Sequence, residues 1–248
     1  MPDHTLLRMI GRGSYGEVWL ARNVMGTYRA VKVVYRDTFD NDQPYEREFA
    51  GIRKYEPVSR SHESQVDILQ IGRNDELRYF YYVMELADGA SQVQSAEGGA
   101  RNGEVQHPET SIQPETYIPR TLQHDLDTRG RLPYDECLEI SLGLAGALKH
   151  LHERGLVHRD IKPSNIIFVH GIPKLADIGL VTHVEATLSF VGTEGYLPPE
   201  GPGTPQADIF SLGKVIYEMA TGRDRQDYPE LPTSLIETPA AERAALAE

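Results

Sequence analysis

The sequence predicts an α+β fold, in which strands and helices occupy different parts of the chain. Short runs rich in Val, Ile and Tyr, separated by glycines, fill the first third, and such runs are typical of strands. A polar stretch over residues 88–117 then interrupts the pattern. Beyond it lie two long segments whose apolar side chains recur at helical spacing.

Five strands and one helix are expected before the polar stretch. The expected strands cover residues 6–10, 17–21, 29–35, 66–71 and 77–86. Between the third and fourth of them, residues 44–56 place Phe49, Ile52 and Tyr55 at helical spacing, which predicts a helix.

The polar stretch, residues 88–117, consists mainly of Gly, Ser, Gln and Glu, with almost no large apolar side chain. A segment of this composition cannot bury enough surface to offset the entropy of ordering its chain. We therefore expect a disordered insertion, which divides the chain into residues 1–87 and residues 118–248.

The strongest helix signal covers residues 134–154, where Gly155 marks the end. One face of this helix is expected to carry Leu138, Ser141, Leu142, Ala145, Leu148 and Leu151. A second helix is expected over residues 208–221. Two short apolar runs between these helices, 166–169 and 173–176, are expected to be strands.

Composition narrows the class of protein. The 248 residues carry 37 acidic and 25 basic side chains, a net charge of −12. This balance argues against a protein that binds nucleic acid or an anionic membrane through a basic surface. Cys137 is the single cysteine, and no run approaches the roughly 18 apolar residues of a membrane span. We therefore expect a cytoplasmic protein without membrane contact in this segment.

A glycine-rich turn lies between the first two expected strands. Gly11, Gly13 and Gly16, with Ser14 between them, would let backbone amides approach a polyphosphate without obstruction by side chains. A dinucleotide-binding loop would instead open a helix, whereas the residues after Gly16 continue as a strand. Taken alone, the pattern also fits an ordinary glycine-rich hairpin.

Lys32 lies in the next apolar strand. Its ammonium could bind nucleotide phosphates if a carboxylate of the following helix fixed it in place. Glu48 is the preferred partner because Ile52, one turn later, keeps the apolar face of the helix turned inward, and Glu46 is the alternative. The same residues could also be a lysine at a strand edge and a solvated glutamate, without a functional role.

The most specific pattern is the run from His158 to Asn165, His-Arg-Asp-Ile-Lys-Pro-Ser-Asn. Three of its side chains together predict phosphoryl transfer. Asp160 would accept the proton of an attacking hydroxyl, Lys162 would neutralise charge and Asn165 would bind magnesium. Asp177, which ends a later apolar run, supplies a second hard oxygen ligand for magnesium. We interpret His158 as a buried structural residue.

In their order along the chain, these motifs resemble those of the eukaryotic-type (Hanks-type) serine/threonine protein kinases, a family with bacterial members. Residues 192–200 are similar to the end of the activation segment of that family, and residues 208–213 to the start of the central helix of its second lobe. Residues 162–165, together with Gly192 and Thr193, are similar to the serine/threonine branch. The resemblance covers the chain from about residue 6 to its end, apart from the polar insertion.

The resemblance implies a small β-rich N-lobe, a larger, mainly helical C-lobe and a cleft between them for ATP and magnesium. The implied catalytic residues are Asp160, Lys162, Lys32 and Glu48, and the implied metal ligands are Asn165 and Asp177. The implied nucleotide-binding residues are Ile10, Gly11, Gly13, Ser14, Gly16, Val18, Ala30, Lys32, Met84, Glu85, Ala87 and Ile167. Within this set, residues 85–87 are similar to the hinge whose backbone binds adenine.

Three departures from the family pattern affect these expectations. Ile178 stands where a phenylalanine usually follows the metal-binding aspartate, and as an apolar residue it is expected to fill the same packing position. The insertion at 88–117 lengthens a connection that is normally short. The chain ends at Glu248, which predicts a truncated, incomplete C-lobe that lacks the usual arginine partner of Glu200.

The leading interpretation is a protein kinase that transfers the γ-phosphoryl group of ATP to serine or threonine hydroxyls of a protein substrate. The alternative is a pseudokinase, a scaffold that binds nucleotide without turnover because its C-lobe is incomplete. A kinase-fold enzyme acting on small-molecule hydroxyls is less consistent with residues 192–200, which such enzymes commonly lack. Oligomeric state is not predicted.

Overall fold

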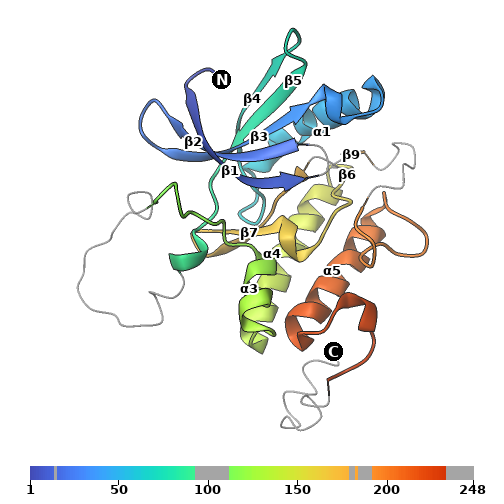
Figure 1. The fold of residues 1–248 in the computed structure, drawn as a ribbon. Coiled ribbons are helices and arrows are strands. Elements are labelled where there is room, and N and C mark those ends of the chain that lie inside the picture. Colours follow the sequence, from blue (N-terminus) through green and yellow to red (C-terminus); the bar gives the residue numbers. More distant parts are fainter. Residues whose placement is uncertain (14–15, 93–111, 179–181, 184–191, 233–248) are drawn as a thin grey trace.

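The computed structural model describes residues 1–13, 16–92, 112–178, 182–183 and 192–232. Figure 1 shows an antiparallel sheet with one helix, which we call the N-lobe, above a larger and mainly helical C-lobe. One main cluster of buried apolar side chains is centred on the N-lobe and includes Leu151, Leu156 and Ile178 of the C-lobe. A second cluster lies within the C-lobe. This arrangement confirms the predicted α+β fold class.

The N-lobe is built on a five-stranded sheet of order β1-β2-β3-β5-β4, in which every neighbouring pair is antiparallel. Its strands are β1 (His4–Gly13), β2 (Gly16–Asn23), β3 (Tyr28–Tyr35), β4 (Ile68–Asn74) and β5 (Tyr79–Met84). All five strands expected from the sequence are present, with their ends shifted by a few residues.

Helix α1 (Asp42–Ser59) packs against this sheet. Asn41 caps its N-terminus, because its side chain accepts a hydrogen bond from a first-turn amide. Ile52 and Tyr55 are buried in the N-lobe core, and Phe49 packs against the same cluster. The three residues whose spacing predicted the helix therefore form its inward face.

A close approach between β2 and β3 explains the glycine at position 16. A Cβ atom on Gly16 would lie 2.3 Å from the carbonyl oxygen of Val33. No side chain fits at that distance, so the packing of the two strands requires glycine here.

The described part of the C-lobe contains three α-helices and two small antiparallel pairs. They are α3 (Leu122–Arg129), α4 (Tyr134–His152), α5 (Pro205–Thr221), the pair β6 (Leu156–Val157) with β9 (Thr182–His183), and the hairpin of β7 (Ile166–Val169) and β8 (Ile172–Leu175). Helix α3 was not predicted, because it is short and mostly polar and therefore shows little apolar periodicity.

The buried face of α4 differs from the predicted one. Its buried side chains are Cys137, Ile140, Leu144, Ala147, Leu148 and Leu151. Leu138 is 43 % exposed and Leu142 is 65 % exposed, so these two leucines face outward. Apolar residues surround much of this helix, and the spacing alone therefore did not determine which stripe faces the core. The predicted and observed stripes share only Leu148 and Leu151.

The buried carboxylate of Asp208 attaches helix α5 to the loop between β6 and β7. It accepts hydrogen bonds from the backbone amides of His158 and Arg159, both at 2.8 Å. The ring of His152 on α4 lies 2.9 Å from the same carboxylate. Within this loop Arg159 has a φ of 74°, in the left-handed region that non-glycine residues rarely occupy.

The two described ends of the predicted insertion lie side by side. The amide of Ala90 donates to the carbonyl of Ile118 at 2.9 Å, and the amide of Arg120 donates to the carbonyl of Asp88 at 2.7 Å. Residues 93–111 lie outside the described residues, so their disorder stays a prediction.

The corrected face of α4 can be tested with a pair of matched substitutions. Leu148→Ala removes a fully buried side chain and should lower the free energy of unfolding by about 2–5 kcal/mol. Leu142→Ala, on the exposed face, should change it by less than about 0.5 kcal/mol. Chemical denaturation measures both, and equal losses for the two variants would contradict the assignment.

The contact between Asp208 and the loop can be tested by Asp208→Asn. The amide retains one acceptor but turns a donor toward a backbone N–H, so we expect a loss of about 3 kcal/mol in the free energy of unfolding. Asp40→Asn, at an exposed position, is the control and should leave the urea concentration at the midpoint of unfolding unchanged. Similar midpoints for the two variants in urea unfolding would rule out a structural role of the buried carboxylate.

Candidate active site

A cleft of about 420 Å³ lies between the two lobes. It is lined by Ile10, Gly11, Gly13, Val18, Ala30, Lys32, Met84, Glu85, Ala87, Asp160, Lys162, Asn165, Ile167 and Asp177. Among the other residues implied by the resemblance, Gly16 packs between two strands and Glu48 lies behind Lys32. Ser14 lies outside the described residues.

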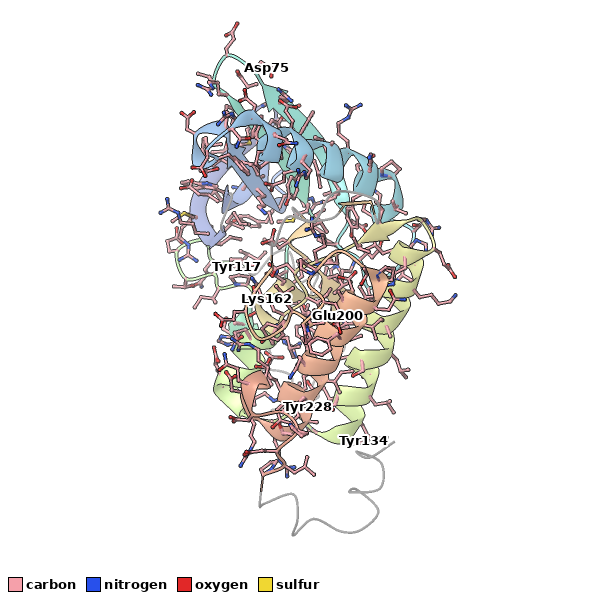
Figure 2. All side chains as sticks on the ribbon, turned by 90° about the vertical axis from the view of Figure 1, so that its right-hand side faces the viewer. Asp75, Tyr117, Tyr134, Lys162, Glu200 and Tyr228 are labelled. Carbon is pink, nitrogen blue, oxygen red and sulfur yellow. The ribbon has the colours of Figure 1, made fainter. Side chains whose placement is uncertain are left out.

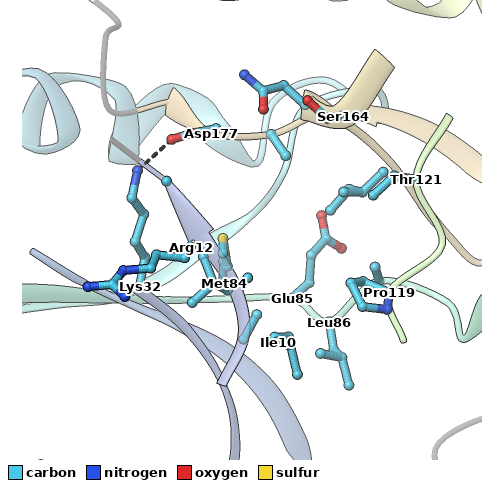
Figure 3. A pocket seen from close by; sticks show the side chains of 18 of the residues that line it. Ile10, Arg12, Lys32, Met84, Glu85, Leu86, Pro119, Thr121, Ser164 and Asp177 are labelled. Atoms are coloured by element: carbon cyan, nitrogen blue, oxygen red, sulfur yellow. Dashed lines mark hydrogen bonds and ion pairs between the residues drawn. The ribbon is translucent and has the colours of Figure 1, made fainter. Parts of the chain in front are cut away.

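The inner end of the cleft is formed by β5 and the hinge that follows it, as Figure 3 shows for Met84, Glu85 and Leu86. Ala30 and Met84 lie opposite each other on β3 and β5. In the described part of the chain, no backbone hydrogen bond occupies the carbonyl of Glu85 or the amide of Ala87. Both residues line the cleft, so within the described chain this acceptor and this donor are available to a ligand.

Lys32 lies between two carboxylates that come from different lobes. Its Nζ is 2.5 Å from Oδ1 of Asp177, a contact drawn in Figure 3, and 3.8 Å from Oε1 of Glu48 on α1. Glu46, the alternative partner considered from the sequence, instead pairs with Arg73 at the surface. The structure thus places Glu48, and not Glu46, beside the lysine.

The charges around Lys32 stabilise one another unequally. Burial disfavours the ammonium, but Asp177, Tyr82 and Glu48 together raise the pKa of Lys32 well above its usual value. Burial opposes ionisation of Asp177 as well, yet the charge of Lys32 holds the pKa of that carboxyl below its usual value. Burial dominates for Glu48, raising its pKa to about 7. Lys32 is therefore paired with Asp177 more closely than with Glu48.

Two buried polar groups next to Lys32 lack a hydrogen-bond partner within the described residues. They are the carboxylate of Glu48 and the hydroxyl of Tyr82, which faces Lys32 from the neighbouring strand. Burial raises the pKa of Tyr82, so its phenol keeps its proton and remains a hydrogen-bond donor.

Asp160 is the centre of a hydrogen-bond network in the loop before β7. One carboxylate oxygen accepts from the hydroxyl of Thr193, and the other accepts from the side-chain amide of Asn165, both at 2.8 Å. The ammonium of Lys162 lies 2.9 Å from this carboxylate and donates to Thr193 at 2.8 Å. The network fixes the orientation of the Asp160 carboxylate and brings a cation to it. The role of Thr193 was not predicted.

Backbone strain is found at two positions of the cleft region. Arg159 and Asp177 have φ values of 74° and 52°, although neither is glycine. Such conformations persist only where surrounding contacts enforce them, and they cluster at functional sites. His158 is buried and its ring contacts the carbonyl of Ala176, in keeping with a structural role. Ile178 is fully buried in the N-lobe core, as expected for an apolar packing residue.

The donor atoms of Asn165 and Asp177 fit a hard divalent cation. Asn165 uses its side-chain NH₂ to bind Asp160, which leaves its amide oxygen as an acceptor. Asp177 adds a carboxylate on the same cleft. In the described chain, no group of three or more His, Cys, Asp or Glu side chains could hold a metal by itself. A cation with few protein ligands, completed by phosphate and water oxygens, is the binding mode typical of magnesium.

Among the cleft-lining residues that were not predicted, three come from the segment that follows residues 93–111. Tyr117, Pro119 and Thr121 line the cleft, although residues up to 117 were assigned to the insertion. Figure 2 shows Tyr117 and Lys162 at the level where the lobes meet. The tyrosine itself, within an otherwise polar run, was the one available signal.

The pKa of Glu48 predicts a pH dependence of stability. This pKa is higher in the folded protein than its usual 4.5, so protonation of Glu48 favours the folded state. The resulting contribution to the free energy of unfolding is complete below about pH 4.5 and is lost as the pH rises through 7. Glu48→Gln is neutral throughout, so the free energy of unfolding should rise relative to wild type by up to about 3 kcal/mol between pH 4.5 and 8.

This is measured by urea unfolding of the nucleotide-free protein at a series of pH values. Arg73 lowers the pKa of Glu46, so Glu46→Gln should follow the wild-type curve over the same pH range. Parallel curves for wild type and Glu48→Gln would contradict the burial argument.

Comparison with known proteins shows the same family along most of the chain. The model of the protein kinase domain matches residues 4–229. The chain is 29 % identical to serine/threonine-protein kinase PrkC of Bacillus subtilis over 89 % of its own length and 30 % of that protein. It is 32 % identical to a serine/threonine-protein kinase of Corynebacterium efficiens, covering 90 % of this chain and 39 % of the relative.

A shorter match gives a higher identity. Serine/threonine-protein kinase PknL of Mycobacterium tuberculosis is 40 % identical over 112 residues, which are 41 % of this chain and 28 % of that protein. The matched region is thus well under half the length of each of these curated relatives. With the family model matching from β1 to beyond α5, the chain belongs to the protein kinase domain family.

Proposed function

We propose that this chain transfers the γ-phosphoryl group of ATP to serine or threonine hydroxyls of a protein substrate, with magnesium as the metal. The single observation that carries the proposal is the convergence of Lys32, Asp160, Lys162, Asn165 and Asp177 on one cleft. Each of them suits one requirement of phosphoryl transfer, namely phosphate binding, orientation of the hydroxyl or charge neutralisation.

The nucleotide base would occupy the inner end of the cleft. The free carbonyl of Glu85 and the free amide of Ala87 match the 6-amino group and N1 of adenine. Ala30 and Ile167, from the two lobes, supply apolar surface for the faces of the ring, and Val18 adds to it from β2.

The phosphates would extend toward Lys32, with Glu48 behind it to hold the ammonium in position. Asn165 and Asp177 are the residues that would hold magnesium. When bound, the ion supplies positive charge that neutralises the phosphate oxygens. Because Asp177 now binds Lys32, it would have to share its carboxylate between the lysine and the metal.

Asp160 would orient the substrate hydroxyl and accept its proton. Its carboxylate is fixed by Asn165 and Thr193, so it needs no reorientation when a hydroxyl arrives. Lys162, 2.9 Å from Asp160, would place a positive charge beside the phosphoryl group in transit. This arrangement supports transfer to an alcohol group.

A protein substrate and a cytoplasmic location complete the proposal. The relatives are named serine/threonine-protein kinases, and residues 162–165 share the pattern of that branch. Within the described residues, none of the helices combines the length and the apolar character needed to cross a lipid bilayer. The single cysteine, which is free and buried, suits a reducing compartment, where ATP is also available.

Asp160→Asn tests the proposed chemistry. The amide cannot accept the proton, so transfer of radiolabelled phosphate from ATP to serine- and threonine-containing peptides should fall at least about 100-fold. Binding of ADP, measured by calorimetry, should stay within about threefold of wild type, because the proposed role of Asp160 is to orient the substrate hydroxyl and not to bind the nucleotide base.

Asp127→Asn on the exposed side of α3 is the matched control and should keep full activity. Transfer by Asp160→Asn at the wild-type rate would contradict the assigned role. A wild-type chain that binds ADP but transfers no phosphate would instead favour the nucleotide-binding scaffold.

A further inference from the structure

Arg120, in the segment that leads into α3, joins three parts of the structure. Its backbone amide donates to the carbonyl of Asp88, directly after the hinge, at 2.7 Å. Its backbone carbonyl accepts from the amide of Phe168 on β7 at 3.2 Å. Its guanidinium forms an ion pair with Asp125 on α3, at 2.7 Å. One residue therefore connects the chain after the hinge with β7 and with α3.

The side chain of Arg120 is held by a carboxylate and by an aromatic ring. Its Nε and Nη2 both donate to Oδ2 of Asp125, at 3.0 and 2.7 Å. The carbon of the guanidinium lies 4.0 Å from the centroid of the Phe168 ring, which is buried in the C-lobe core. Asp125 is only 4 % exposed, so water competes little for the ion pair. A lysine could not present two nitrogens to the carboxylate and a flat cation to the ring.

The two chain neighbours of Arg120 form part of the cleft wall. Pro119 and Thr121 both line the cleft, and Figure 3 shows them on the same side of it as Glu85. Thr121 also forms an isolated bridge with Ile167, another residue of the cleft. Because consecutive residues are covalently joined, a displacement of Arg120 would shift both neighbours. The contacts of Arg120 therefore fix the position of this wall.

Arg120 itself is not among the residues that line the cleft. Its guanidinium is engaged by Asp125 and Phe168, so any effect on a ligand has to pass through its neighbours. A wall that is already fixed loses little conformational freedom when a ligand binds against it. A loosened wall would have to be ordered by the ligand, which lowers the affinity.

Building on the proposed ATP site, we propose that Arg120 is a positioning residue for nucleotide binding, which holds the cleft wall of Pro119 and Thr121 in its binding position. Asp125 and Phe168 serve the same purpose by fixing the guanidinium. The transfer step is assigned to other residues, so loosening the wall should weaken nucleotide binding and leave the chemical step unchanged.

The test is Arg120→Lys, which keeps the positive charge but loses the paired nitrogens and the flat cation. Calorimetry should show that the variant binds ADP about five-fold more weakly than wild type, the equivalent of one lost hydrogen bond. In the peptide phosphorylation assay the KM for ATP should rise by a similar factor, while kcat stays within about twofold. Asp125→Asn should reproduce this pattern, and the double variant should stay within about twofold of the weaker-binding single variant.

Arg129→Lys is the matched control. Arg129 lies on α3 and binds Glu136 through two nitrogens, at 2.8 and 2.5 Å, but it is not among the residues that line the cleft. This variant should keep the wild-type Kd for ADP. Leu148→Ala controls for stability, because it removes a buried side chain of the C-lobe core and should also keep the wild-type Kd at a temperature where the variant is folded.

An unchanged Kd in Arg120→Lys and Asp125→Asn would overturn the inference and leave the proposed ATP site standing. An equal rise in Arg129→Lys or Leu148→Ala would overturn it too, because the effect would then follow stability and not the wall. If Arg120→Lys failed to fold, the Kd and the KM of Asp125→Asn would decide. A wild-type chain that binds no ADP would overturn the proposed ATP site together with this inference.

Discussion

The buried carboxylate of Asp208 is the contact on which the geometry of the cleft depends most. It is 1 % exposed and accepts hydrogen bonds from two successive backbone amides of the loop before β7. These bonds fix the strained turn at Arg159, and the next residue in the chain is Asp160. Helix α5 therefore controls the position of the proposed base through the main chain, without a side chain of its own in the cleft.

A second constraint is the sharing of Lys32 between the lobes. Asp177 belongs to the C-lobe and Glu48 to the N-lobe, and the lysine lies closer to Asp177. Glu48 is buried without a hydrogen-bond partner within the described residues, and its burial raises its pKa. One ammonium group therefore connects α1 of the N-lobe with Asp177 of the C-lobe.

The sequence predicted elements whose information is local and missed those that depend on distant contacts. Strand alternation and the motif around Asp160 are short-range patterns, and they located the N-lobe sheet and most of the cleft-lining residues. The prediction of which face of α4 is buried was wrong, because apolar residues such as Leu142 occur on both sides of that helix. Tyr117 and the hydrogen bond from Thr193 to Asp160 were not predicted, because both depend on contacts between distant parts of the chain that no local pattern records.

The pairing of Ala90 with Ile118 closes the base of the long connection after the hinge. The described residues on either side of residues 93–111 are hydrogen-bonded to each other, so the two flanks are held at adjacent points. The entropy of closing a flexible loop grows only with the logarithm of its length, about 0.6 kcal/mol for each doubling. This site on the hinge is therefore a place where the family fold can accept or lose residues at low cost in stability, and where a foreign segment could be joined to a kinase without rebuilding its nucleotide cleft.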